Sequence, residues 1–250
     1  MAIALKVENL KKTYGKGRKS SHALKGISFE VREGEIFGIL GPNGAGKSTT
    51  LNILIGLLSP TSGKVSIFGK NFFKNESETK NRMNIATAYA DLASNLSVYR
   101  NLKVFALMYG IKNSKNKICE LLEKFQISEL KNRLITDLSA GQKTRVNLCK
   151  SLINDPELLL LDEPTASLDP AIAKHVREML LDIQKKRKLT IIFTSHNMLE
   201  VEQMCDQVAL LHKGEIYKID TPDNLKKFLE VESMEEVFIK LAKGELEYDE

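Results

Sequence analysis

The hydrophobic and polar positions along the first third of the chain predict strands around one helix. Residues 27–31 alternate polar and apolar side chains, as a half-buried strand does, and residues 35–40 form a short apolar run that ends at a Gly-Pro turn. Apolar residues over 51–58 recur at helical spacing, and residues 65–68 return to a strand pattern. We therefore expect a β-rich region that encloses a helix ending at residue 58.

The rest of the chain predicts a helical segment and then a return to alternating strand and helix. Apolar residues recur at helical spacing from about residue 93 to residue 153. Residues 157–161 are continuously apolar, which is typical of a strand buried in a parallel sheet. The elements expected after it are an amphipathic helix over 172–183, a strand over 190–195 and a hairpin of 208–211 with 215–219. This pattern predicts one compact α/β unit with a helical insertion.

The composition is that of an ordinary globular protein. The chain has 250 residues, of which 42% are hydrophobic and 28% charged, and this excludes collagen-like and disordered classes. The net charge of +5 identifies no partner. Three cysteines without a CxxC pair indicate a reducing compartment and argue against a disulfide framework or a zinc site. No apolar stretch approaches the ~20 residues needed to cross a bilayer, and the N-terminus does not resemble a secretory leader.

Two clusters of charge have ordinary explanations. The basic run over 185–188 ends a predicted helix, where the helix dipole favours cations. We therefore interpret it as a helix end, and a nucleic-acid patch is the alternative. The acidic tail over 230–250 still carries apolar residues at helical spacing, and these predict a docked helix followed by solvated residues. The apolar positions of that helix are Met234, Val237, Phe238 and Leu241.

Residues 41–48 match the phosphate-binding pattern G-x-x-x-x-G-K-[ST] between a predicted strand and a predicted helix. Glycines let backbone N–H groups turn toward phosphate oxygens, and the helix presents its positive end to the same anion. Lys47 is expected to reach the β- and γ-phosphates, and Ser48 to ligate Mg²⁺. The alternative is a plain glycine-rich turn. The expected nucleotide contacts are Gly41, Pro42, Asn43, Gly44, Ala45, Gly46, Lys47, Ser48 and Thr49.

Two acids follow the buried strand predicted over 157–161. Ligands of open α/β sheets collect at the carboxyl ends of strands, so Asp162 is a candidate for holding Mg²⁺ through water. Glu163 is the candidate base that accepts a proton from, or orients, the attacking water. The alternative is a pair of acids that caps the next helix. The NKxD element that selects guanine does not occur in the sequence, so ATP is favoured over GTP.

Four further elements stand in a fixed order around these two motifs. They are Tyr14, the Leu-Ser-Ala-Gly-Gln run over 138–142, Ser-Leu-Asp over 167–169, and His196. Together with the phosphate loop and the paired acids, they resemble the nucleotide-binding subunit of ATP-binding-cassette (ABC) proteins over nearly the whole chain. The run over 138–142 is close to that family's LSGGQ signature. The C-terminal part is similar to stand-alone ATPase subunits of export-type (ABC-2) transporters.

The resemblance implies a role for each matching residue. Tyr14 would stack on adenine, and the alternative is an ordinary surface tyrosine. His196 would hydrogen-bond the γ-phosphate and position Glu163 with the water, and the alternative is a capping histidine. Asp169 would lie at the interface of two subunits, and the alternative is a helix cap. The signature residues, which would contact ATP held by a partner subunit unless they only start a helix, are Ser139, Ala140, Gly141 and Gln142.

The resemblance also implies an architecture and a mechanism. A P-loop NTPase core with an antiparallel β subdomain would cover about residues 1–92 and 154–229, a helical subdomain about 93–153, and a C-terminal helix and tail 230–250. Two chains would sandwich two ATP molecules with Mg²⁺, and hydrolysis would release the closed dimer. A separate integral-membrane permease would convert closure into export. The ATPase would then act on the cytoplasmic face of the membrane, as a homodimer, with no nucleic-acid partner.

Two positions depart from the family pattern. Ala140 stands where the signature usually has glycine, and we expect its contact to survive. The glutamine that normally follows the strand into the helical insertion is missing from residues 84–92, where Asp91 is a candidate oxygen ligand. Two alternatives stay open: a soluble ABC ATPase of translation or DNA repair, and a nucleotide switch of low turnover.

Overall fold

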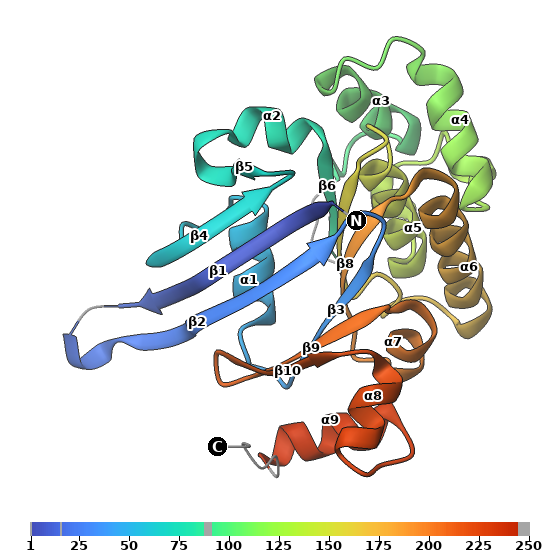
Figure 1. Ribbon diagram of the computed structural model, residues 1–250. Helices are drawn as coiled ribbons and strands as arrows, with labels where there is room; N and C mark the ends of the chain where they lie inside the picture. Colours follow the sequence, from blue (N-terminus) through green and yellow to red (C-terminus); the bar gives the residue numbers. More distant parts are fainter. Residues whose placement is uncertain (1, 16, 88–91, 245–250) are drawn as a thin grey trace. The chain divides into compact units, whose positions relative to one another are not determined.

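The computed structural model describes residues 2–15, 17–87 and 92–244 (Figure 1). The chain forms two compact units, one from Met1–Lys80 with Thr190–Glu250 and one from Asn81–Leu189. The short 3-10 helices are η1 (Gly17–Lys19), η2 (Phe72–Lys74), η3 (Ser128–Leu130) and η4 (Ile135–Asp137). Within the described ranges, no helix combines the length and the apolar character that a bilayer crossing requires.

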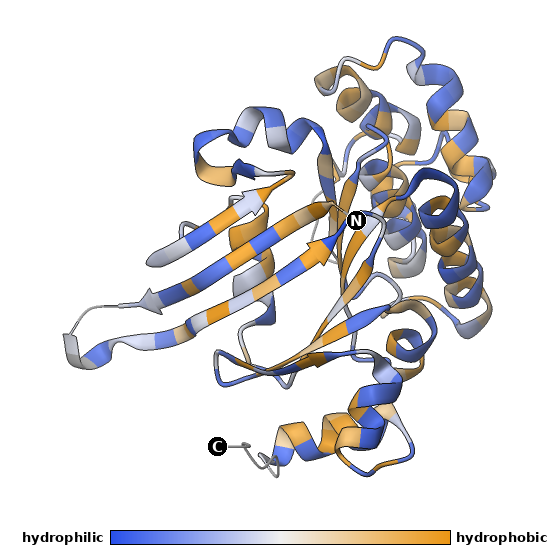
Figure 2. Ribbon diagram, viewed as in Figure 1, coloured by the Kyte–Doolittle hydropathy of each residue, from blue (hydrophilic) through white to orange (hydrophobic). Residues whose placement is uncertain are grey.

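The first unit contains a four-stranded antiparallel sheet in the order β2-β1-β4-β5 (Figure 1). Its strands are β1 (Ile3–Tyr14), β2 (Ser21–Arg32), β4 (Ser62–Ile67) and β5 (Lys70–Asn71). Apolar and polar residues alternate along β2, as predicted (Figure 2). The apolar side chains at 27, 29 and 31 are buried, so one face of this strand packs on the core and the other meets solvent.

The same unit holds strands in the order β10-β9-β3-β8. These are β3 (Ile36–Leu40), β8 (Thr190–Thr194), β9 (Gln207–His212) and β10 (Glu215–Asp220). β3 runs parallel to both β8 and β9, and every residue of β3 and β8 is buried. β9 and β10 pair antiparallel, which confirms the predicted hairpin. The carboxyl ends of β3 and β8 therefore lie side by side at one edge.

The helices of the first unit flank these strands. They are α1 (Lys47–Leu54), α2 (Glu76–Asn81), α7 (Met198–Met204), α8 (Pro222–Phe228) and α9 (Met234–Lys243). The prediction that the first of them runs to residue 58 was wrong. It ends at Leu54, because Gly56 takes a left-handed φ of 73° and turns the chain out of the helix. Leu57, which lies in the part predicted to be helical, is consequently 77% exposed.

The second unit pairs two parallel strands with the helical segment. Its strands are β6 (Met83–Thr87) and β7 (Leu158–Asp162), and its helices are α3 (Val98–Met108), α4 (Ser114–Lys124), α5 (Ala140–Ser151) and α6 (Pro170–Arg187). The helical insertion and the buried strand after it are confirmed. The basic run over 185–188 ends α6, as the dipole argument predicts. The predicted C-terminal helix is α9.

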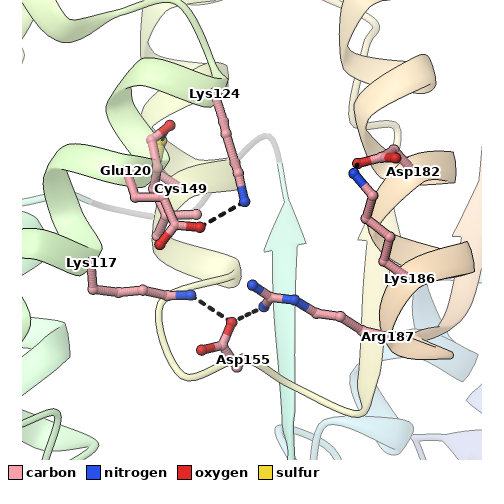
Figure 3. A network of polar contacts seen from close by, with 9 residues as sticks. Lys117, Glu120, Lys124, Cys149, Asp155, Asp182, Lys186 and Arg187 are labelled. Atoms are coloured by element: carbon pink, nitrogen blue, oxygen red, sulfur yellow. Dashed lines mark hydrogen bonds and ion pairs between the residues drawn. The ribbon is translucent and has the colours of Figure 1, made fainter.

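A polar network connects elements of the second unit (Figure 3). Asp155, in the loop before β7, accepts a hydrogen bond from Lys117 Nζ of α4 at 2.5 Å and another from Arg187 of α6. Beside it, the Lys124 ammonium donates to Glu120 and holds the pKa of that carboxyl below its usual range. One carboxylate thus joins the helical insertion to the end of α6.

Candidate nucleotide-binding and hydrolysis site

The phosphate loop leaves β3 at a position where only glycine fits. A Cβ on Gly41 would lie 2.1 Å from the Leu211 carbonyl oxygen of β9. Gly46 has a φ of 115°, and a Cβ there would meet Leu24 and the Ala23 carbonyl of β2 within 3 Å. Strands β9 and β2 therefore border the loop closely at two of its glycines, where no side chain covers the backbone.

Lys47 is the first residue of α1 and is largely buried, with 9% of its surface exposed. Its Nζ donates to the carbonyls of Gly41 at 2.5 Å and Pro42 at 3.2 Å. These bonds hold the ammonium within the loop. Ser48 is exposed one residue later, and the first turn of α1 carries no acidic side chain. This arrangement can bind a phosphate group, because a cation and the positive end of a helix occupy one turn.

Tyr14 is the last residue of β1 and pairs with Ser21 of β2. Its side chain is 43% exposed, and Lys12 Nζ lies 5.2 Å from the centre of its ring. The same strand β2 supplies Ala23, which borders Gly46 in the phosphate loop. One strand therefore positions both a half-exposed aromatic ring and the loop, which suits a nucleotide with a base and a phosphate chain.

His196 follows β8 at the edge where β3 ends. Gly38 of β3 lies opposite Phe193 of β8, so His196 and Gly41 emerge from adjacent ends of parallel strands. The structure therefore brings His196 to the edge of the sheet that carries the phosphate loop. Its side chain is exposed. In open α/β sheets this edge is where ligands bind.

Asp162 and Glu163 lie at the carboxyl end of β7 in the second unit. Asp162 is the last residue of the strand and pairs with Thr87, the last residue of β6. Glu163 takes a left-handed φ of 52°, which a non-glycine residue rarely adopts. Both side chains are half-buried. Asp91, the candidate ligand in place of the missing glutamine, lies outside the residues that the structure describes.

The signature residues begin α5 with a capping box. Ser139 Oγ accepts from the Gln142 N–H at 3.3 Å, and the Gln142 side chain accepts from the Ser139 N–H at 2.9 Å. Ser139 and Ala140 are exposed at this helix start. Gln142 therefore has a structural task, which the S-x-x-Q spacing signals. The helix start that we considered as an alternative is present, and contact with a partner's nucleotide stays a prediction.

The signature also contacts the segment that follows β7. A Cβ on Gly141 would lie 3.0 Å from the Ser167 carbonyl oxygen, and Thr144 Oγ1 is 2.6 Å from Ser167 Oγ. Asp169 ends this segment and caps α6, because its carboxylate accepts from the Ile172 N–H at 3.1 Å. The capping alternative for Asp169 is thus confirmed, and its place at a subunit interface stays a prediction.

Some contacts near the candidate residues were not among the sequence predictions. Three such contacts form in the folded chain. The Lys12 ammonium lies over the Tyr14 ring, and the buried Glu200 accepts a hydrogen bond from Ser195. The Phe238 ring packs against His196. The apolar stripe of the C-terminal helix was a signal for docking, but it does not say which side chain Phe238 meets. Asp169 followed by Pro170, the first residue of α6, was a signal of the helix start that the sequence contained.

The sequence and the fold match known proteins. Residues 24–166 match the family described as ABC transporter. The bacitracin transport ATP-binding protein BcrA of Bacillus licheniformis is 38% identical over 227 residues, which are 91% of this chain and 72% of that protein. The lantibiotic transport ATP-binding protein SrtF of Streptococcus pyogenes is 35% identical over 226 residues, which are 89% of this chain and 94% of that protein.

Solved structures agree with these relatives. An ATP binding subunit of an ABC transporter superposes with a TM-score of 0.85 at 25% identity and covers 95% of this chain and 99% of its own. A dimeric post-hydrolysis state of the ATP-binding cassette MJ0796, bound to ADP and Pi, has a TM-score of 0.79 at 26% identity and covers 87% and 98%. The relatives favour a transporter subunit over an ATPase of translation or DNA repair. The chain therefore belongs to the ABC transporter family, in which it is an ATP-binding and ATP-hydrolysing subunit.

Proposed function

We propose that the chain works as one of two ATPase subunits that power export through a separate integral-membrane permease. The observation that carries the proposal is the phosphate loop, whose Gly41 and Gly46 are required by neighbouring backbone and whose Lys47 is buried inside it. A fluoroquinolones export ATP-binding protein of Mycobacterium tuberculosis, 36% identical over 214 residues, supports the export direction, and the dimeric cassettes support pairing. ATP is a cytoplasmic substrate, so the subunit acts on the cytoplasmic face of the membrane.

The nucleotide contacts follow from the first unit. Backbone N–H groups within residues 41–49, to which Pro42 contributes none, and the Lys47 ammonium bind the phosphates, and Tyr14 stacks on adenine. His196 donates a hydrogen bond to the γ-phosphate, which strengthens as negative charge spreads over the phosphoryl oxygens in the transition state.

The hydrolytic groups are two acids of the second unit. Glu163 accepts a proton from water as the water oxygen bonds to the γ-phosphorus and the bond to the bridging oxygen of ADP breaks. Ser48 and Asp162 offer oxygen ligands, which are the donors that Mg²⁺ prefers, so these residues fit the metal. When bound, Mg²⁺ neutralises phosphate charge.

The signature completes the site of a second copy. Ser139 and Ala140 are exposed at the start of α5, so this helix end is available to the γ-phosphate of ATP bound by the partner subunit. ATP then binds the closed dimer more tightly than the open one, and hydrolysis removes this difference. The permease uses the resulting closing and opening.

The variant Glu163→Gln tests this proposal. We expect it to keep ATP affinity, to accumulate as an ATP-bound dimer in light scattering, and to lose nearly all hydrolysis. A matched double variant adds Ala140→Asp, because an acid in the first turn of α5 favours the helix but repels phosphate. It should bind ATP and remain monomeric. Unchanged hydrolysis in Glu163→Gln removes Glu163 from the mechanism, and a dimer that persists with Asp at 140 removes the signature from the interface.

A further inference from the structure

We propose that Phe238 of the C-terminal helix α9 is a positioning residue for His196. The inference rests on the proposed function of His196 at the γ-phosphate. It adds that the C-terminal helix sets the direction of the histidine ring, so that the rate of hydrolysis depends on a segment that does not itself touch nucleotide.

The two rings meet edge to face. Their centroids are 6.4 Å apart and their planes are inclined by 81°. This is the geometry that aromatic pairs prefer, because the positive edge of one ring faces the negative face of the other. His196 is exposed at the end of a strand, and a histidine side chain has several staggered rotamers. The aromatic contact favours the rotamer in which the two rings meet edge to face.

The helix that carries Phe238 is itself firmly held. Met234, Val237 and Leu241 are fully buried, and Phe238 lies at the edge of this apolar stripe. The Met234 N–H donates to Glu202 Oε1 of α7 at 3.3 Å, and Glu202 also pairs with Lys226 of α8 at 3.0 Å. α9 is thus tied to α7, the helix that begins directly after His196.

Hydrogen bonds of Ser195 hold the backbone next to His196. Ser195 Oγ donates to the fully buried Glu200 at 3.0 Å and accepts from the Asn197 N–H at 3.0 Å. These bonds act on the backbone around residue 196, whereas the contact with Phe238 acts on the ring itself.

Two substitutions at residue 238 separate the ring from its volume. Phe238→Leu keeps an apolar side chain of similar size and removes the ring, whereas Phe238→Tyr keeps the ring. We expect kcat for ATP hydrolysis by the purified chain to fall about 2- to 12-fold in Phe238→Leu, with KM for ATP unchanged. Phe238→Tyr should hydrolyse ATP at the wild-type rate, because it keeps the ring. Ile239→Ala, on the exposed side of the same helix, is the matched control and should match wild type.

NMR of the histidine rings reports the contact independently of activity. The chain has four histidines, and the signal missing in His196→Ala identifies residue 196. In Phe238→Leu the His196 ring protons should shift, because the ring current is lost. His212 reports docking of α9, since a Cβ on Gly244 at its end would lie 3.7 Å from His212 Cε1. The His212 signals should stay in place.

The double variant His196→Ala/Phe238→Leu decides the inference. If Phe238 acts through His196, the second substitution lowers kcat no further. A further loss in the double variant, a wild-type kcat in Phe238→Leu, or His196 signals that do not move would each overturn the inference while leaving ATP hydrolysis by Glu163 intact. If His196→Ala itself hydrolyses normally, the role of His196 fails, and the positioning role of Phe238 fails with it.

Discussion

Gly141 lies so close to Ser167 that a Cβ at position 141 would be 3.0 Å from the Ser167 carbonyl oxygen. This contact places the beginning of α5 directly against the segment between β7 and α6. The hydrogen bond between Thr144 and Ser167 reinforces it. The signature therefore packs directly against the residues that follow Glu163.

The contact predicts unequal effects of enlarging residue 141. In Gly141→Ala, crowding at Ser167 opposes the gain of roughly 1 kcal/mol in helix propensity, so the free energy of unfolding should change little. Gly141→Val adds bulk that cannot fit and should destabilise by about 1–3 kcal/mol. Urea unfolding of both variants measures this difference. Ala140→Val, at the exposed neighbouring position, is the control and should cost less than Gly141→Val. Equal losses at 140 and 141 would show that the contact is unimportant.

Lys47→Ala should weaken ATP binding about 10- to 150-fold, because it removes charge-assisted hydrogen bonds to phosphate. Titration calorimetry with ATP measures the affinity directly. Lys64, an exposed lysine of β4, provides the control, and Lys64→Ala should bind ATP as the wild type does. Normal ATP affinity in Lys47→Ala would argue against the phosphate loop as the nucleotide site.

Asp155→Asn should lower the free energy of unfolding by about 0.5–1 kcal/mol. Asparagine tolerates the left-handed φ of 47° at this position, so the substitution removes charge without backbone strain. The Lys117 side chain is only 11% exposed, and its ammonium would lose a counter-ion. Asp182→Asn breaks an exposed pair with Lys186 and is the control, with an expected loss at the low end of this range (Figure 3). The difference should shrink in high salt. Equal losses from the two variants would contradict the bridging role of Asp155.

His212 should make the protein less stable in mild acid. Burial and the neighbouring Lys213 and Lys25 lower its pKa in the folded state from the ordinary value of 6.5, while Glu215 acts in the opposite direction. Below this value the unfolded chain binds more protons at His212 than the folded chain does, so stability falls as the pH falls through 6.5 toward the folded pKa. His212→Gln should flatten the fall between about pH 7 and pH 5, measured by urea unfolding. Identical pH slopes would contradict this assignment.

The elements that the sequence predicted well are those whose signals are local. Alternation along β2, the apolar run of β7 and the helical spacing of α6 each reflect one face packed on the core. The same local logic was wrong at the end of α1. Leu58 has helical spacing with the apolar residues before it, but the left-handed backbone at Gly56 ends the helix first.

The candidate site could be predicted as residue types but not as contacts. The glycines at 41 and 46 follow from the motif, whereas the Leu211 and Ala23 carbonyls that require them come from strands far apart in the sequence. Phe238 and His196 likewise meet only because α9 docks beside α7. The periodicity of one segment shows which of its faces is apolar, but it does not show which side chain of another segment that face contacts.

The left-handed backbone at Glu163 has a consequence for the evolution of this chain. Glycine or asparagine would adopt that conformation at lower cost, so the acid is held where it lowers thermostability. Selection for heat resistance alone, without a demand for turnover, should therefore replace Glu163 early. Variants selected for both heat resistance and ATP hydrolysis should keep Glu163 and gain their stability from substitutions far from this turn.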